Sequence, residues 1–600
     1  MQEAVRVLVD FVAPQGGAGV RHAFAAPRAV LQAWSPHEVR GVIDQAHAAA
    51  TAGAWCVGFV RYEAAPAFDA AYAVHEAPAA GPAQPLAWFA VFDQALPWDE
   101  SAAGCPYAAT DWQAELAPAA FGAGMARIAR AIEDGENYQI NYTMRLAGTF
   151  AGDAEAFFHA LRRSQPDTYA AFIDTGHGQV LSVSPELFFE WRDGQLLSRP
   201  MKGTAARGAT PEADAAQAEH LRTSEKERAE DLMIVDLIRN DISRVAQPHT
   251  VKVPRLFHTQ AWPTFWGMTS DVTAASRPGA RLSDVFAALF PCGSVVGVPK
   301  VRAMQLIRAL EPSPRGVYCG AIGVLQSGGA ATFNVAIRTV AIDAQGRALG
   351  AVGSGVTSDA RPDGEWREWR DKWAFLRRAS EPFDVLETVL LQDGRLPWKT
   401  AHLDRMAATA AWFGRPWDAA VRTRAEALLQ EQADLQPQGT WRVRLLLDAA
   451  GQLSAQAVAQ PALAQPVRVV LADRPLLDAT HEFVRHNTTR RVHYDALAPH
   501  APGVFDTLLW NEAGELTEFT RGNVVLKIDG RWLTPPLACG LLAGVGRARL
   551  LVEGLPPEAG ADAGQPVHEA VVLRDDLTRA EAVAFVNSCR GWMPVVFAAV

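Results

Sequence analysis

Lysine is scarce in this 600-residue chain. Only seven of its 56 basic residues are lysines, and the other 49 are arginines. Arginine stays protonated in proteins, whereas a desolvated lysine amine can lose its proton and act as a base or nucleophile. Because arginine carries the ordinary surface charge, a lysine in this chain has a raised chance of a specific role, although a solvated charge is still the usual state.

Cysteine is also sparse, and no two cysteines form a C-x-x-C pair. The six cysteines are Cys56, Cys105, Cys292, Cys319, Cys539 and Cys589. The cysteines are widely separated along the chain, which does not suggest a disulfide framework. It indicates reduced thiols, most of them in the core, in a cytoplasmic protein.

A basic patch and a long apolar run are both missing. The net charge is −10, which argues against a nucleic-acid partner. The N-terminal stretch "MQEAVRVLVDFVAPQ" has Glu3, Arg6 and Asp10 among its apolar residues, so it lacks a signal-peptide core, and no run is long enough to span a membrane. With 49% apolar and 20% charged residues, the composition is that of a globular protein without a membrane partner.

The length is too great for one hydrophobic core. Alternating helix and strand patterns extend to residue 377 and begin again at "EPFDVLETVLLQDGRLPWKTAHLDRM". We therefore expect an N-terminal part over 1–117, a mixed core over 118–377, a linker at 378–382 and a second domain over 383–600.

Two pairs of glutamates have helical spacing. "TSEKERAEDLMIVDLIRND" predicts a helix that Ser224 caps, with Glu227 completing a capping box and Glu230 on the same face. "RPDGEWREWRDKWAFL" places Glu365 and Glu368 at the same spacing. The two pairs could converge on one Mg²⁺ ion, although capping and solvated helix faces explain the spacing equally well.

Small and charged residues near the second glutamate pair suggest anion binding. In "AVGSGVTSD", Gly353, Ser354 and Gly355 could present backbone N–H groups to a carboxylate, or simply form a glycine-rich turn. "RGVYCGAIGVL" and "FNVAIRTV" predict consecutive strands that carry Tyr318 and Arg338. An arginine among apolar neighbours needs an anion, from a side chain or from a substrate.

Several ordered motifs give the first half a specific resemblance. They are "GENYQINYT", "SPELFFE", "PMKGT", "KERAEDLMIVDLIRND", "GSVVGVPKVRAMQLI", "RGVYCGAIG", "FNVAIRT" and "GSGVTSD…EWRE". Over about residues 118–377 the chain resembles the chorismate-utilising enzymes. The resemblance implies an α+β fold: an anthranilate-synthase-like β-sandwich with surrounding helices. The lysine of "PMKGT" is typical of members that convert chorismate and ammonia to 4-amino-4-deoxychorismate, and another chorismate or isochorismate transformation is the alternative.

The resemblance also implies residue roles. Glu230 and Glu368 bind Mg²⁺, with Glu227 and Glu365 beside them, and Glu186 of "SPELFFE" is the general acid. The substrate-binding positions are Gly203, Thr204, Tyr318, Arg338, Gly353, Ser354 and Gly355.

The chemistry explains Lys202 of "PMKGT". Loss of the 4-hydroxyl of chorismate needs a proton donor at that oxygen, for which Glu186 is suited, and a nucleophile at C2, for which Lys202 is suited. Ammonia then adds at C4 and expels the lysine. Several relatives carry a histidine in the segment that matches "WPTFWGMTSDV", where this chain has Gly267, and this disfavours a histidine-assisted mechanism.

The ammonia is expected from a partner. A glutaminase needs a nucleophilic cysteine on a glycine-flanked elbow, and Cys292 in "FPCGSVVG", which comes closest, lies within the synthase motifs. We therefore expect a separate glutaminase subunit.

The second half resembles the fold-type IV pyridoxal-phosphate enzymes, in particular lyases of 4-amino-4-deoxychorismate. The resemblance rests on "FDVLETVLLQDGRLPWKTAHLDRM", "GELTEFTRGNVVL", "LTPPLACGLLAGVGRARLL" and "FVNSCRGWMPV", and it implies a smaller α/β domain. Arg405 and the turn of Gly544, Val545 and Gly546 match the phosphate cradle. Glu518 matches the carboxylate that pairs with the pyridine nitrogen.

The lysine that forms the Schiff base is missing. Fused relatives read H-K-T-T where this chain reads "HNTT", which puts Asn487 at the lysine position. An amide is not basic and cannot form an imine. The hypothesis is a domain that keeps the fold, with weak or no lyase activity and doubtful cofactor binding. The alternatives are a fully bifunctional synthase-lyase, rescued by Lys399 or Lys527, and a structural or docking module.

Overall fold

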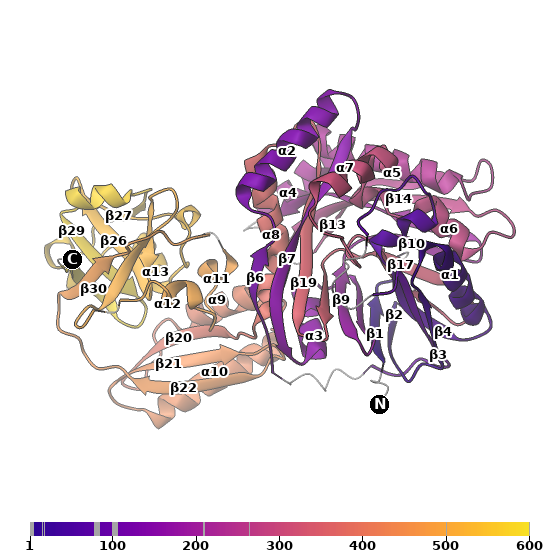
Figure 1. Ribbon diagram of the computed structural model, residues 1–600. Coiled ribbons are helices and arrows are strands. Elements are labelled where there is room, and N and C mark those ends of the chain that lie inside the picture. The colour runs from indigo at the N-terminus through magenta and orange to yellow at the C-terminus, as the bar shows by residue number, and fades with distance from the viewer. Residues whose placement is uncertain are drawn as a thin grey trace. The chain divides into compact units, whose positions relative to one another are not determined.

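The computed structural model describes residues 5–14, 16, 19–76, 84–98, 106–207, 211–262, 265–479, 481–499 and 501–598 (Figure 1). Cys105 lies outside these residues. The chain forms two compact units, unit 1 over Met1–Pro382 and unit 2 over Phe383–Val600. Helix α8 continues to Ser380, so most of the stretch expected as a linker belongs to the last turn of that helix.

Unit 1 is built on two large sheets. In the first, the order is β15-β7-β19-β18-β9-β8-β1-β2, and β6 pairs with β7. Its strands are β1 Arg6–Phe11, β2 Val20–Ala25, β6 Tyr107–Ala114, β7 Gln139–Gly152, β8 Tyr169–Asp174, β9 Gly178–Ser184, β15 Gly297–Val298, β18 Thr339–Asp343 and β19 Arg347–Val356.

The second sheet has the order β12-β14-β11-β10-β17-β16-β4-β5-β3, and β13 pairs with β14. Its strands are β3 Ala29–Ala33, β4 Trp55–Val60, β5 Ala87–Phe92, β10 Leu187–Arg192, β11 Gln195–Arg199, β12 Met201–Ala206, β13 Lys252–Ala261, β14 Phe265–Ala275, β16 Ala321–Leu325 and β17 Ala331–Val335.

The two sheets pack face to face. One buried cluster combines Val9 of β1 and Ile173 of β8 with Phe59 of β4, Trp88 of β5 and Ile322 of β16. Because it draws residues from both sheets, this cluster is the interior of a β-sandwich. The α+β sandwich that the motifs implied is therefore confirmed.

Helices surround this sandwich. They are α1 Pro36–Thr51, α2 Pro118–Glu133, α3 Ala154–Ser164, α4 Pro211–Thr223, α5 Glu225–Ser243, α6 Leu282–Leu289, α7 Lys300–Leu310 and α8 Pro362–Ser380, with short 3-10 helices η1 Tyr62–Ala67 and η3 Gly293–Val295. Within the described parts of the chain, no helix is long and apolar enough to cross a membrane.

Two helix boundaries lie where the sequence predicts them. Helix α2 ends at Glu133, and Gly135 follows at φ 73°, a left-handed conformation that favours glycine. The Ser224 hydroxyl caps α5 by accepting a hydrogen bond from the Glu227 N–H at 3.3 Å, which is one half of the predicted capping box.

Unit 2 contains a three-stranded sheet and a barrel. The small sheet has the order β20-β21-β22, with β20 Val385–Gln392, β21 Thr440–Leu447 and β22 Leu453–Ala459. The other sheet has the order β25-β24-β23-β30-β29-β26-β27-β28, and an additional β25–β26 pairing closes six of its strands into a barrel. These strands are β23 Val467–Leu471, β24 Asp506–Trp510, β25 Leu516–Phe519, β26 Gly522–Ile528, β27 Arg531–Thr534, β28 Val567–Glu569, β29 Ala582–Asn587 and β30 Gly591–Phe597.

The helices of unit 2 complete its mixed α/β architecture. They are α9 Lys399–Trp412, α10 Ala419–Leu435, α11 Glu482–Arg485, α12 Val492–Asp495 and α13 Val545–Glu553, with 3-10 helices η4 Leu537–Cys539, η5 Pro557–Asp562 and η6 Arg574–Arg579. A buried cluster including Leu403, Val443 and Leu429 joins α9 and α10 to the small sheet.

Candidate functional site

Lys202 of unit 1 lies on β12 beside a β-bulge. Lys202 pairs with Met268 of β14 and Thr204 pairs with Gly267, so Gly203 is the extra residue. Gly203 has φ 65°, and a Cβ atom built on it would lie 2.8 Å from Glu227 Oε2. A bulge bends its strand and changes the direction of the neighbouring side chains. Glycine at this position therefore lets β12 approach the helix that carries Glu227.

The Lys202 amine reaches the glycine-rich strand β19. A Cβ atom built on Gly355 would lie 2.8 Å from Lys202 Nζ, so glycine leaves room for the amine. Burial is the main cause that lowers the pKa of Lys202. The negative charge of Glu230 acts to raise this pKa, and the positive charge of Lys372 acts to lower it. The structure thus brings the segments "PMKGT" and "GSGVTSD" together around one amine.

Glu186 is a buried carboxyl between β9 and β10. Its side chain is 3% exposed, and its Oε1 atom has no hydrogen-bond partner within the described structure. Burial raises its pKa to about 7, although a hydrogen bond from Ser294 and the charge of Lys202 act in the opposite direction. A carboxyl of this kind can hold a proton near neutral pH and donate it.

The two glutamate pairs approach each other from different helices. Burial raises the pKa values of Glu227, Glu230 and Glu365, and repulsion from Glu368 contributes to each shift. All four carboxylates therefore share one electrostatic environment, even though α5 and α8 are more than 100 residues apart.

Two lysines lie close to this carboxylate group. Lys372 Nζ lies 2.6 Å from Glu368 Oε1, and Lys226 Nζ lies 3.9 Å from Glu230 Oε1. Although burial acts to raise it, the charge and hydrogen bond of Lys372 lower the pKa of Glu368. Within the described residues, no three His, Cys, Asp or Glu side chains are already gathered closely enough to hold a metal ion.

Ser354 connects the glycine-rich strand to α8. Its hydroxyl donates to Glu365 and accepts a hydrogen bond from Trp369 Nε1 at 2.7 Å. Lys372 Nζ donates to the Gly353 carbonyl at 3.0 Å. These contacts fix the orientation of Glu365 and Lys372 relative to β19. Ser354 therefore holds α8 in place through its side chain.

The predicted strand positions of Tyr318 and Arg338 are wrong. Tyr318 lies in the turn before β16, and Arg338 lies between β17 and β18 with φ 49°. The left-handed backbone interrupts the strand at Arg338. The Arg338 guanidinium packs 4.6 Å from the ring centre of Phe265, its Nη1 is buried without a hydrogen-bond partner, and burial lowers its pKa to about 10. An anion is the natural partner for this group.

Two further polar residues, Gln139 and Ser294, lie beside Lys202 and Glu186 and were not predicted from the sequence. Gln139 is fully buried with no partner for its amide, and its Nε2 lies 2.6 Å from a Cβ built on Gly355. Ser294 hydrogen-bonds Glu186. Gln139 is a polar residue at the start of a strand with alternating apolar residues, and this pattern could have identified it. Nothing in the sequence distinguishes Ser294 from other serines.

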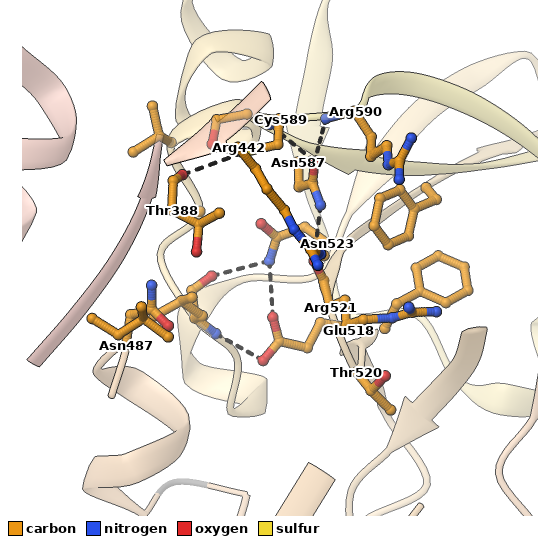
Figure 2. Close-up of a pocket in the computed structure, with 18 of the residues that line it drawn as sticks. Thr388, Arg442, Asn487, Glu518, Thr520, Arg521, Asn523, Asn587, Cys589 and Arg590 are labelled. Carbon is orange, nitrogen blue, oxygen red and sulfur yellow. Dashed lines mark hydrogen bonds between the residues drawn. The ribbon is translucent and has the colours of Figure 1, made fainter. Parts of the chain in front are cut away.

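Unit 2 contains a separate cavity of about 350 Å³. Its wall includes Arg405 of α9, Glu518 of β25, and Gly544 and Val545 at the start of α13. Figure 2 shows Asn487 and Glu518 at this cavity.

Hydrogen bonds fix the side chains of Arg405 and Glu518. Both oxygens of Glu387 accept hydrogen bonds from Arg405, at 2.8 and 2.7 Å, and the Ala543 carbonyl accepts another at 3.0 Å. Glu518 accepts hydrogen bonds from Tyr494 Oη at 2.6 Å and from the Leu542 N–H at 3.0 Å. Burial raises the pKa of Glu518 to about 8.

The glycines at the start of α13 are required by close packing. A Cβ atom on Gly544 would lie 1.9 Å from Asn523 Oδ1, and one on Gly546 would lie 2.9 Å from the Asn587 carbonyl carbon. The helix can therefore begin at the cavity wall with its first N–H groups near the cavity.

No lysine lines this cavity among the described residues. Asn487 lies on its wall, where its main-chain carbonyl accepts a hydrogen bond from the Leu386 N–H at 3.0 Å. Lys399 begins α9, and Lys527 on β26 pairs with Asp562 at 3.0 Å. Neither lysine belongs to the cavity wall, so the structure does not support rescue by either.

Unit 1 combines a β-sandwich with a buried acid (Glu186), a partly buried lysine (Lys202) and a group of carboxylates on α5 and α8, as in an enzyme. The family model of chorismate binding enzymes matches residues 15–378, and the chain belongs to this family. The family model of class IV amino-transferases matches residues 384–596.

Among curated relatives, the chain is 40% identical over 282 residues to aminodeoxychorismate synthase component 1 of Klebsiella aerogenes, covering 46% of this chain and 62% of that protein. It is 37% identical over 263 residues to the protein of the same name from Escherichia coli K12, covering 44% of this chain and 58% of that one. The matched segments thus span less than two thirds of these relatives.

A solved structure shows the same fold in unit 1. The menaquinone-specific isochorismate synthase of Escherichia coli matches with a TM-score of 0.51 and 18% identity, over 63% of this chain and 89% of that one.

Proposed function

We propose that unit 1 converts chorismate and ammonia to 4-amino-4-deoxychorismate, as an aminodeoxychorismate synthase component I. The position of the Lys202 amine carries the proposal. The amine lies beside Gly355, its pKa is lowered, and the charges of Glu230 and Glu186 act on it. The names of the curated relatives support the same reaction.

In this proposal, Lys202 is the nucleophile and Glu186 is the general acid. Glu186 protonates the departing 4-hydroxyl while the neutral Lys202 amine attacks C2 of the ring. Ammonia then adds at C4, and Lys202 leaves with its bonding pair. Arg338, with its unpaired nitrogen, and the backbone at Gly353 and Gly355 are suited to the substrate's carboxylates.

The carboxylates of α5 and α8 have the chemistry to hold a divalent cation. Glu227, Glu230 and Glu365 have raised pKa values because they are buried close to another negative charge, and a cation would relieve that repulsion. We assign Glu230 and Glu368 as its ligands, with Glu227 and Glu365 beside them. A bound Mg²⁺ supplies positive charge for a substrate carboxylate. Lys226 and Lys372 would then give up part of their contact with these glutamates.

The pH dependence tests the role of Glu186. Its pKa is raised to about 7, so the proton it must donate is present below pH 7 and is lost as the pH rises through 7. Loss of this proton should therefore lower kcat/KM above pH 7. Glu186→Gln cannot ionise, so it should lose this transition and reduce the rate by about 10²–10⁴-fold. An unchanged rate in Glu186→Gln would refute the assignment.

The source of ammonia gives the direct test of the function. We propose a glutaminase subunit as partner, because no described cysteine has the setting of a nucleophile. Four of the five described cysteines, Cys56, Cys292, Cys319 and Cys539, are buried, and burial raises the pKa of each thiol to about 12. The fifth, Cys589, is partly exposed, and burial raises the pKa of its thiol to about 11. With chorismate and Mg²⁺, the purified chain should form 4-amino-4-deoxychorismate from ammonium salt and little from glutamine. If the chain used glutamine as well as ammonium, the proposal of a partner glutaminase would be wrong. If ammonium gave no aminated product, the proposed synthase activity would be wrong.

For unit 2 we propose a cavity that accepts pyridoxal phosphate with little lyase activity. Arg405 and the N–H groups at Gly544 to Gly546 would hold the phosphate, and Glu518 would face the pyridine nitrogen. When bound, this cofactor supplies an aldehyde and an electron-accepting ring. Asn487 can neither form an imine with the aldehyde nor transfer a proton as an amine does.

A further inference from the structure

Arg338 of unit 1 is a cation for which the described residues supply no counter-ion. Its Nη1 atom is buried without a hydrogen-bond partner in the described structure. Burial lowers its pKa to about 10, and no charged side chain of the described residues contributes to that shift. A desolvated guanidinium without a carboxylate is costly until an anion binds to it. Its counter-ion must therefore come from a bound ligand.

An aromatic ring lies against this guanidinium instead of a carboxylate. The guanidinium carbon of Arg338 lies 4.6 Å from the ring centre of Phe265, the first residue of β14. The face of an aromatic ring attracts a guanidinium, and the N–H edge of the guanidinium stays available for hydrogen bonds to an anion. Phe265 thus orients Arg338 without neutralising its charge.

Trp262 supports the Phe265 ring. The two ring centres are 5.0 Å apart and their planes differ by 6°, so the rings form a parallel stack, the Trp262–Phe265 stack. The Trp262 N–H donates to the Phe265 carbonyl at 2.8 Å, and the Trp262 carbonyl accepts from Arg207 Nη1 at 2.7 Å. Arg207 in turn pairs with Asp214 of α4 at 2.6 Å. These hydrogen bonds fix the position of the stack.

Glycine at position 267 leaves room for the stack. A Cβ atom built on Gly267 would lie 2.7 Å from Trp262 Cζ3, 3.1 Å from Met201 Sδ and 3.4 Å from Phe265 Cε2. The first distance is shorter than a van der Waals contact, so a larger residue would displace the Trp262 ring. Met201 precedes Lys202 on β12, and the stack therefore lies beside the strand that carries the proposed nucleophile.

We propose that the Trp262–Phe265 stack positions Arg338 to bind one carboxylate of the substrate, and that Gly267 is required because it leaves room for the stack. Phe265 and Trp262 are positioning residues, since they act through Arg338. The inference rests on the function proposed for unit 1, because chorismate, a dicarboxylate, supplies the anion. It assigns to the stack the affinity for chorismate and not the rate of amination.

Calorimetric titration of the full chain with chorismate tests this inference, with Mg²⁺ present and without ammonium or glutamine. Phe265→Leu removes the aromatic face and should weaken chorismate binding about tenfold. Phe265→Tyr keeps that face and should remain within about twofold of the parent chain. With ammonium added, Phe265→Leu should raise KM about tenfold and change kcat less than about threefold, because Lys202 and Glu186 are intact.

A double-mutant cycle tests the role of Gly267. Gly267→Ala should weaken chorismate binding about tenfold, because its methyl group displaces the Trp262 ring from Phe265. Trp262→Phe makes the second ring smaller and should have a weaker effect. The double variant should bind chorismate more tightly than Gly267→Ala alone, because the smaller ring makes room for the methyl group. Additive losses would contradict the proposed fit between Gly267 and the stack.

Trp98→Leu is the control, because it removes a ring that lies 4.8 Å from the guanidinium of Arg162, an arginine already paired with Asp10. It should bind chorismate like the parent chain. Parent-like binding by Phe265→Leu, or equal affinities of Phe265→Leu and Phe265→Tyr, would overturn the positioning role, as would a fall in kcat at unchanged KM.

The titration also separates this inference from the proposed reaction. A parent chain that binds chorismate but forms no aminated product would refute the synthase reaction, and the affinities of the Phe265 variants would still decide the role of the stack. A parent chain that does not bind chorismate would overturn both.

Discussion

Replacing Lys202 by alanine should reduce the formation of 4-amino-4-deoxychorismate from chorismate and ammonium on the order of a thousandfold or more, because the variant has no nucleophile for C2. The remaining turnover should give no product or an unintended one. Chromatography of the products, with Mg²⁺ present throughout, measures both the rate and the product distribution. Burial lowers the pKa of this amine and so favours its neutral, nucleophilic form.

Two variants separate this role from a structural one. Lys202→Arg keeps the positive charge but not the nucleophilic amine, so it should be as inactive as Lys202→Ala. Lys252→Ala removes an exposed lysine from β13, which pairs with β14 in the same sheet, and should leave the rate unchanged. If Lys202→Ala made the same product at the parent rate, the nucleophilic role would be wrong, and a chorismate transformation that does not use Lys202 would become the better interpretation.

Asn487→Lys should convert unit 2 into a protein that binds pyridoxal phosphate covalently. Asn487 lies on the cavity wall with Arg405 and Glu518, so a lysine there would place an amine at the cavity. We expect a new visible absorbance band on adding the cofactor, a shift of that band on borohydride reduction, and cofactor that remains with the protein through denaturing gel filtration. The parent chain should lose the cofactor in the same procedure.

Asn487→Met is the matched control, because methionine has nearly the length of lysine and no amine. It should resemble the parent chain in every readout. Covalent attachment in the parent chain would mean that another lysine already serves the site, which would contradict the proposed effect of Asn487. Absence of attachment in Asn487→Lys, with the fold intact by circular dichroism, would contradict the placement of the cofactor.

Local signals predicted several parts of this structure correctly. Helical periodicity and a glycine stop defined α2, and the hydroxyl of Ser224 begins α5 as its sequence indicates. These features depend on residues within one or two turns of each other, and short-range interactions can therefore be inferred from sequence. The ordered motifs also identified the chorismate binding family and the class IV amino-transferase match.

Other features depend on backbone geometry that side-chain patterns do not reveal. Alternating apolar residues predicted a strand through Arg338, but its left-handed backbone separates β17 from β18. The bulge at Gly203 likewise appears in the register of β12 against β14, a strand more than 60 residues away. In both places the tertiary pairing decides the direction of the side chain.

The sequence by itself determined which residue types are present and which are missing: few lysines, one of them in "PMKGT", and Asn487 in place of the expected one. Only the tertiary structure decided what surrounds them. Burial gives Lys202 and Glu186 their shifted pKa values, and folding brings Arg338 into contact with Phe265, more than 70 residues away along the chain. Desolvation and long-range charge depend on atoms that are distant along the chain and close in space, so they emerge only when the chain is folded.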